Sequence, residues 1–153
     1  MPAGAGAADA PHASETEMHL GQGGGAGLRS FLYNGGMSAT VIGLQGELGS
    51  GKTTFAQAFG KVMGVKEDMQ SPTFVIMKLY NIDPSTSSGQ AWHRFKKLIH
   101  IDAYRIEKEE ELLKLGWEEL IKNSENLILI EWPERVEGLI PKDSKRILFQ
   151  HER

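Results

Sequence analysis

The chain has 153 residues, of which 40% are hydrophobic and 24% charged, the proportions of one ordinary globular domain. Its formal net charge of −3 argues against a strongly basic nucleic-acid-binding face, and the absence of cysteine excludes disulfides, zinc fingers and thiol catalysis. No apolar run approaches the roughly 20 residues that a membrane helix needs, and the N-terminus lacks the pattern of a secretory signal. We therefore expect a cytoplasmic protein without a membrane segment.

The N-terminal segment differs in composition from the rest of the chain. Residues Met1–Ala13 are almost entirely small or polar. Such a segment buries too little apolar surface to offset its ordering entropy, so we predict a disordered tail there and a single domain over residues 14–153. After a glycine-rich stretch, Leu28, Phe31 and Leu32 follow at helical spacing and predict a short helix.

A strand and a helix are predicted next. Ala39–Leu44 is a short apolar run, partly β-branched, which is typical of a strand buried on both faces. Lys52–Met63 has the spacing of an amphipathic helix, and Gly64 follows as its stop signal. The apolar stripe of this helix is expected to consist of Phe55, Phe59, Val62 and Met63.

The second half of the chain continues the alternation of strands and helices. Further strands are predicted at Thr73–Tyr80, Lys97–Ile101, Leu127–Ile130 and Arg146–Gln150. Glu107–Ile121 is predicted to be helical, with an apolar face of Leu112, Leu115 and Leu120 and a break at Gly116. Strands alternating with helices predict an α/β sandwich with a largely parallel central sheet and flanking helices.

A phosphate-binding motif lies between the first strand and the helix that follows. Gly46–Thr53 matches G-x-x-x-x-G-K-[ST] at every fixed position, in the strand–loop–helix context that a P-loop requires. Glycines let the backbone wrap closely around an anion, and successive N–H groups then point inward at a helix N-terminus. Lys52 supplies a mobile positive charge for the β- and γ-phosphates, and the Thr53 hydroxyl is a ligand for Mg²⁺. The nucleotide-binding residues are expected to be Glu47, Leu48, Gly49, Ser50, Gly51, Lys52, Thr53, Thr54 and Trp132.

Two strand-end carboxylates accompany the P-loop. Glu131 follows four apolar residues, as the acid of a Walker B strand does, and Asp102 ends the strand that begins at Lys97. In this class of fold both lie at the sheet edge where ligands bind. We assign Glu131, with Thr53, to Mg²⁺, and Asp102 to the attacking water or to a second metal contact. The predicted catalytic residues are thus Lys52, Asp102 and Glu131.

Other residues near these motifs leave two interpretations open. Arg105 would neutralise developing phosphate charge or lie on the surface, and Trp132 would stack on a base or pack. His100 alternates with apolar residues, which favours a core histidine over a catalytic one. Ser71–Phe74 lies where many P-loop proteins keep a segment that senses the γ-phosphate, and is otherwise a turn before a strand.

Four segments then appear in order along the chain. They are GELGSGKTT at Gly46–Thr54, SPTF at Ser71–Phe74, HIDAYR at His100–Arg105 and EWPER at Glu131–Arg135. This set resembles the TsaE (YjeE) family, small bacterial ATPases needed for threonylcarbamoyl modification of the adenosine beside the anticodon in certain tRNAs. The resemblance covers roughly residues 14–149.

The resemblance implies a P-loop NTPase-like fold and slow ATP hydrolysis with Mg²⁺. It also implies that the protein is a partner of the TsaD–TsaB pair and does not itself transfer the threonylcarbamoyl group. Contact with tRNA is then expected only indirectly or through partners. Family roles fall on Lys52 and the loop amides for phosphate, Thr53 and Glu131 for Mg²⁺, Asp102 near the reaction, and Thr73 in the switch segment.

Alternative functions make different demands on the sequence. A GTPase would need an Asn-Lys-x-Asp-like guanine reader after a late strand, and the chain has none. A P-loop small-molecule kinase is the main alternative, although such enzymes usually begin with the P-loop strand and carry an arginine-rich lid. A regulatory nucleotide-binding module without meaningful turnover is the third interpretation.

Overall fold

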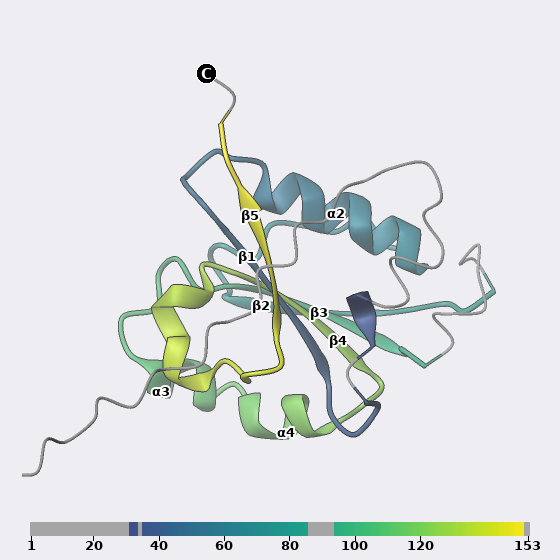
Figure 1. Ribbon diagram of the computed structural model, residues 1–153. Coiled ribbons are helices and arrows are strands. Elements are labelled where there is room, and N and C mark those ends of the chain that lie inside the picture. Colours follow the sequence, from purple (N-terminus) through teal and green to yellow (C-terminus); the bar gives the residue numbers. More distant parts are fainter. Residues whose placement is uncertain (1–30, 34, 86–93, 152–153) are drawn as a thin grey trace, which may run out of the picture.

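A five-stranded sheet forms the centre of the computed structural model, which describes residues 31–33, 35–85 and 94–151 (Figure 1). The strands lie side by side in the order β2-β3-β4-β1-β5. Their bounds are Thr40–Gly46 for β1, Met77–Asn81 for β2, Lys97–Asp102 for β3, Asn126–Glu131 for β4 and Lys145–Phe149 for β5. β1, β3, β4 and β5 run parallel, and only β2 is antiparallel to its neighbour β3. The predicted largely parallel sheet is therefore confirmed.

Helices cover both faces of this sheet. In Figure 1, α2 (Lys52–Met63) lies over one face, whereas α3 (Glu109–Leu113), α4 (Trp117–Lys122) and the 3₁₀ segment η2 (Pro133–Leu139) lie over the other. Alternate residues of each strand point to opposite faces, so the sheet has two cores. The core under α2 contains Ala56, Phe59, Met63, Ile42, Leu44, Leu98, Leu127 and Leu129. The core on the other face contains Leu112, Trp117, Val136, Val41, Ile99, Ile101, Ile128 and Ile130.

The helix after the P-loop has the predicted bounds. Gly64 adopts a left-handed conformation with φ 101° and caps α2, which is the role expected of a glycine after the last turn. One residue of the predicted apolar stripe is wrong, because Val62 is 53% exposed. The residues that face the sheet are Ala56, Phe59 and Met63, whose spacing follows the helical period, and Val62 falls outside that arc.

The predicted break at Gly116 is also observed. Gly116 has φ 87° and separates α3 from α4. Of the predicted apolar face, Leu112 is fully buried, but Leu115 is 42% exposed. Leu115 lies beyond the end of α3, in the turn that leads to Gly116, and no longer follows the helical period of Leu112.

The strand predicted at Thr73–Tyr80 is wrong over its first half. Residues 73–76 form turns, because the N–H groups of Val75 and Ile76 both donate to the carbonyl of Pro72 at 3.1 and 2.7 Å. Ile76 has φ 67°, a left-handed conformation that is uncommon for a β-branched residue. The strand β2 therefore begins only at Met77.

Some predictions fall outside the described residues. These are the disordered tail at Met1–Ala13 and the first part of the helix near Leu28; of that helix, Phe31 and Leu32 are described, helical and buried. Among the described helices, none has the length and apolar character to cross a membrane.

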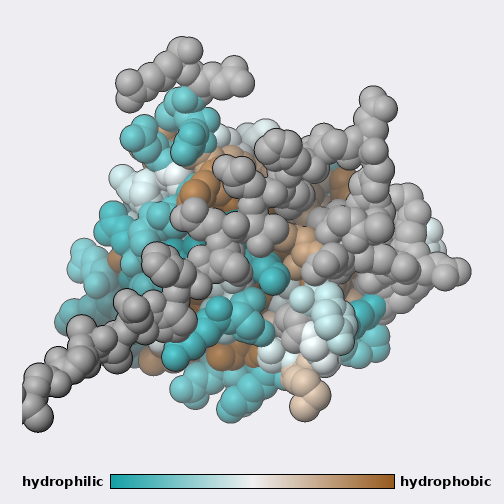
Figure 2. Space-filling model, in the orientation of Figure 1, coloured by the Kyte–Doolittle hydropathy of each residue, from teal (hydrophilic) through white to brown (hydrophobic). Residues whose placement is uncertain are grey.

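The face in Figure 2 is mostly hydrophilic along its lower and left edges, with smaller hydrophobic areas between.

Gly43 allows the chain after β4 to pack against β1. A Cβ atom at this position would lie 2.9 Å from Cγ and 3.2 Å from Cβ of Pro133, a rigid ring that cannot rotate away. We therefore expect Gly43→Ala to lower the free energy of unfolding by about 1–3 kcal/mol, as overpacking in a core does. Chemical denaturation would measure this loss. Pro133→Ala removes the nearest atom, so the loss should be smaller in the double variant, and additive losses would contradict the proposed clash.

Candidate functional site

A cavity of about 420 Å³ opens at the edge of the sheet where β1, β3 and β4 end. Its walls are formed by Leu48, Gly49, Gly51, Lys52, Thr53, Thr54, Thr73, Asp102, Tyr104, Arg105, Glu131 and Trp132. Leu44 pairs with Glu131 and Glu131 pairs with Asp102, so β3 and β4 end at the same level and β1 continues two residues further into the P-loop. The sheet thus brings the P-loop and both strand-end acids to one site.

The loop between β1 and α2 has the conformation that its glycines permit. Gly49 and Gly51 have φ 76° and 97°, values that residues with a side chain rarely adopt. Gly46 is required for a different reason, since a Cβ there would lie 2.7 Å from the backbone oxygen of Phe149 in β5. The loop is therefore fixed at its start by the neighbouring strand and turned by positive φ angles toward α2.

Lys52 places a positive charge within this loop. Its Nζ atom donates hydrogen bonds to the carbonyl oxygens of Gly46 and Glu47 at 2.6 and 2.7 Å and to Ser50 Oγ at 3.3 Å. The ammonium also lies 4.4 Å from the ring centre of Trp132, within the range of a cation–π interaction. Lys52 is only 4% exposed, so its charge is held at the floor of the cavity.

The N-terminus of α2 faces the same cavity. Phe55 N–H bonds the carbonyl of Gly51 as the first hydrogen bond of the helix, and no side chain caps the described N-terminus. The first amides of a helix have no partner within it and carry the positive end of its dipole. With Lys52 beside them, these amides have the charge and orientation that suit an anion such as phosphate.

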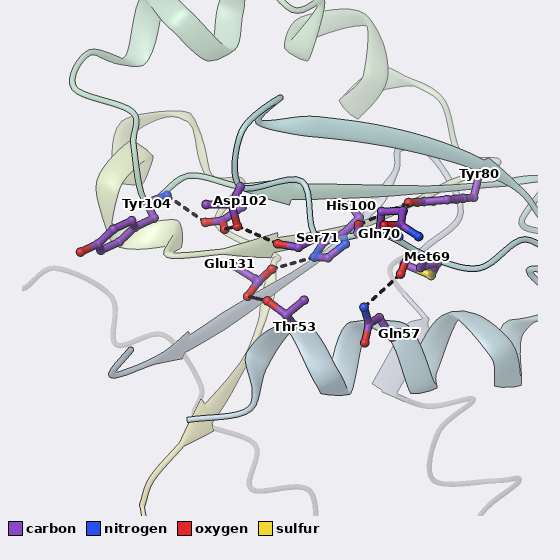
Figure 3. A network of polar contacts seen from close by, with 11 residues as sticks. Thr53, Gln57, Met69, Gln70, Ser71, Tyr80, His100, Asp102, Tyr104 and Glu131 are labelled. Atoms are coloured by element: carbon purple, nitrogen blue, oxygen red, sulfur yellow. Dashed lines mark hydrogen bonds and ion pairs between the residues drawn. The ribbon is translucent and has the colours of Figure 1, made fainter. Parts of the chain in front are cut away.

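Glu131 is held at both of its carboxylate oxygens (Figure 3). The Thr53 hydroxyl donates to Oε1 at 2.7 Å, and His100 Nε2 lies 2.8 Å from Oε2. Glu131 is 2% exposed, and His100 is fully buried. The prediction of a core histidine is correct in its burial, but His100 contacts the acid of the site.

Asp102 has its own partners beside Glu131. Thr73 Oγ1 donates to Oδ2 at 3.0 Å, and the Tyr104 N–H donates to Oδ1 at 3.0 Å. Ser71 Oγ lies 2.6 Å from Thr73 Oγ1, so the hydroxyl chain continues into the Ser71–Phe74 segment (Figure 3). The structure thus connects this segment, predicted as a switch or a turn, to the second acid.

Aromatic and cationic side chains form the rim of the cavity. Trp132 has φ 59°, a left-handed conformation that costs an L-residue about 1–2 kcal/mol. Its ring lies 5.0 Å from that of Tyr104, and the Arg105 guanidinium lies 4.7 Å from the ring centre of Phe74, which is 84% exposed. The strained backbone of Trp132 therefore directs its ring against Lys52 and Tyr104.

Most of the predicted site residues meet in this cavity, although their functions stay predictions. Glu47 and Ser50 are not in its walls and instead accept hydrogen bonds from Lys52. Tyr104 is a wall residue that sequence reasoning did not select. Its position two residues after Asp102 was the one available signal, because a short turn after a strand-end acid returns the chain toward that acid.

The oxygen atoms of Thr53 and Glu131 suit a hard divalent cation whose remaining ligands would come from the substrate and from water. Within the described ranges, no group of three or more His, Cys, Asp and Glu residues forms a metal cluster. Mg²⁺ usually binds through one or two carboxylates together with phosphate oxygens and water, so such a cluster is not needed. Thr53 and Glu131, already in contact beside the anion site, fit that requirement.

Comparison with known proteins connects this geometry to a family. The family model described as "Threonylcarbamoyl adenosine biosynthesis protein TsaE" matches residues 22–153. A relative from Bacillus subtilis, named "tRNA threonylcarbamoyladenosine biosynthesis protein TsaE", is 34% identical over 110 residues, which is 72% of this chain and 61% of the relative. Proteins of the same name from Haemophilus influenzae and Borreliella burgdorferi are each 33% identical, over 68% and 75% of this chain and 58% and 74% of their own lengths. The chain thus spans about six-tenths of the length of the first two relatives.

Proposed function

The chain belongs to the TsaE family, and on that premise we propose that it is a small Mg²⁺-dependent ATPase in tRNA threonylcarbamoyladenosine biosynthesis. The observation that carries the proposal is a single cavity in which a lysine ammonium and an uncapped helix N-terminus face two strand-end carboxylates. The first pair attracts phosphates, and the second pair supplies the acidic groups that phosphoryl-transfer sites use.

Phosphate binding is assigned to the P-loop. The amides at the start of α2 and the Lys52 ammonium would contact the β- and γ-phosphates. Thr53 and Glu131 would hold Mg²⁺, which when bound neutralises charge on the phosphate oxygens. Lys52 already lies on loop carbonyls, so nucleotide binding would exchange those contacts for phosphate oxygens.

Asp102 is assigned to the attacking water. Its two oxygens are oriented by Thr73 and the Tyr104 amide, and it lies next to Glu131 in the strand register. A carboxylate in this position accepts a hydrogen bond from water and aligns it for in-line attack on the γ-phosphate. Arg105, also in the cavity wall, would stabilise the charge that develops on the leaving phosphate oxygens.

Thr73→Val tests the orientation of Asp102. Valine keeps the shape of threonine but removes the hydroxyl that donates to Oδ2 at 3.0 Å. One hydrogen bond contributes about 0.5–1.5 kcal/mol, so we expect kcat for ATP hydrolysis to fall up to about tenfold with a smaller change in KM. Ser85→Ala, a hydroxyl exposed outside the cavity, serves as the control. A wild-type kcat in Thr73→Val would remove Thr73 from the proposal.

A role in tRNA modification implies partner proteins and a cellular location. We propose that the protein acts with a TsaD–TsaB-type pair in the cytoplasm, and that tRNA contacts reach it indirectly or through those partners. Its net charge of −3 supports this division, because phosphate contacts with RNA require clustered positive charge.

The decisive measurement is phosphate release from ATP by the purified chain, with and without a TsaD–TsaB pair from the same organism. We expect slow hydrolysis that needs Mg²⁺ and that changes when the pair is added. A screen of small metabolites as phosphoryl acceptors runs in parallel. Transfer to a metabolite without any response to the pair would replace this proposal with the kinase alternative.

A further inference from the structure

His100 lies in β3 two residues before Asp102, on the face of the sheet that α2 covers. It pairs with Leu129 in β4, two residues before the pair of Asp102 and Glu131, so all these side chains share one face. Its imidazole is fully buried, and Nε2 contacts Glu131 Oε2 at 2.8 Å (Figure 3). The contact joins β3 and β4 inside the protein and approaches Glu131 from the core.

The other imidazole nitrogen shows that packing does not account for this residue. His100 Nδ1 is buried and has no hydrogen-bond partner in the described part of the chain. An unpaired buried polar atom is unfavourable, and the neighbours Leu98, Ile99 and Ile101 show that this strand accommodates apolar residues. An apolar residue at position 100 would therefore satisfy the core better, and among the described residues Glu131 is the one hydrogen-bond partner of the imidazole.

The contact restricts the orientation of the Glu131 carboxylate. The last torsion of a glutamate is broad, so a carboxylate held at one oxygen still rotates. Thr53 holds Oε1 from the helix side, and His100 holds Oε2 from the sheet side. Because the carboxylate accepts, Nε2 carries the hydrogen of this contact.

We infer that His100 is a positioning residue for Glu131, which it holds ready beside Thr53 for the metal and the nucleotide phosphates. This inference rests on the proposed function in one respect, the role of Glu131 as a metal ligand. The His100–Glu131 contact itself is observed in the structure. Partners that orient a ligating carboxylate typically change metal affinity or activity by about 10- to 100-fold when they are removed.

Three substitutions separate positioning from packing. His100→Gln places an amide N–H at about the reach of Nε2 and keeps a donor to Glu131, whereas His100→Asn carries its amide only to about the position of Nδ1. His100→Leu keeps bulk without a donor. Tyr80→Phe is the matched control, because it removes another, partly buried polar contact, from Tyr80 Oη to the Gln70 backbone, away from Glu131.

We expect His100→Leu and His100→Asn to lower kcat about 10- to 100-fold and to raise the Mg²⁺ concentration needed for half-maximal activity. His100→Gln should recover most of that loss, and Tyr80→Phe should keep wild-type kinetics. Binding of a fluorescent ATP analogue in EDTA should stay within about twofold in all four variants. Wild-type Mg²⁺ dependence in His100→Leu, or equal losses in the Gln and Leu variants, would overturn the inference.

Long-range ¹H–¹⁵N spectra of the imidazoles provide a readout that needs no activity. The His100 signal, identified by its absence in His100→Gln, should show hydrogen on Nε2. A signal without hydrogen on Nε2 would overturn the inference, whatever the variants do in the hydrolysis assays. If the wild-type protein does not hydrolyse ATP, the proposed function fails, while the spectrum still decides whether His100 donates to Glu131.

Discussion

Lys52→Met is expected to lower ATP hydrolysis by about 100-fold or more and to weaken nucleotide binding in the absence of Mg²⁺. Methionine keeps the unbranched stem beside Trp132 but removes the ammonium that lies on the carbonyls of Gly46 and Glu47. Lys52 is only 4% exposed, so water screens its charge little. Loss of this charge should therefore weaken both the binding of the phosphates and the stabilisation of the transition state.

Steady-state phosphate release and titration with a fluorescent ATP analogue measure the two effects separately. Lys61→Met, in the last turn of the same helix and exposed, is the matched control for charge and composition. Thermal unfolding of both variants is needed, because Lys52 also bonds loop carbonyls. A folded Lys52→Met protein with wild-type binding and turnover would exclude Gly46–Thr53 as the phosphate site.

The sequence predicted the architecture well where a local pattern determines it. The bounds of α2 and the break at Gly116 follow from periodicity and glycine, and both are local properties. β2 was misplaced because Val75 and Ile76 have the composition of a strand, whereas two hydrogen bonds to Pro72 turn them. Thr73 in the same turn also donates to Asp102, a tertiary contact that no local pattern records.

The residues of the site were largely predictable from the sequence, whereas the contacts between them were less so. The P-loop motif and the two strand-end acids identify residues that the fold brings into one cavity. The role of His100 could not be read from its alternation with apolar residues, because that pattern gives burial and not the partner across the strand. The parallel register of β3 and β4 pairs His100 with Leu129 and thereby places Glu131, two residues further on, on the same face; register is a property of the folded sheet.

Glu131→Gln is the substitution that most directly tests the assignment of the metal-binding acid. Glutamine has nearly the same shape and keeps an oxygen that can accept from the Thr53 hydroxyl, but it removes the negative charge. We expect Mg²⁺-dependent hydrolysis to fall about 100- to 1000-fold, while binding of an ATP analogue without Mg²⁺ is retained. Loss of a charge next to Asp102 should leave phosphate attraction unchanged or stronger, because one repulsive carboxylate has been removed.

Glu134→Gln is the control, since Glu134 lies three residues along the chain and is exposed. Measuring hydrolysis and analogue binding over a range of Mg²⁺ concentrations separates a defect in metal binding from a defect in chemistry. Recovery at high Mg²⁺ would mean that Glu131 acts mainly through metal affinity, whereas a low plateau would mean that it also aligns the phosphates. Turnover equal to wild type at every Mg²⁺ concentration would show that another group holds the metal, and Asp102, its neighbour in the register, would then be the residue to test in its place.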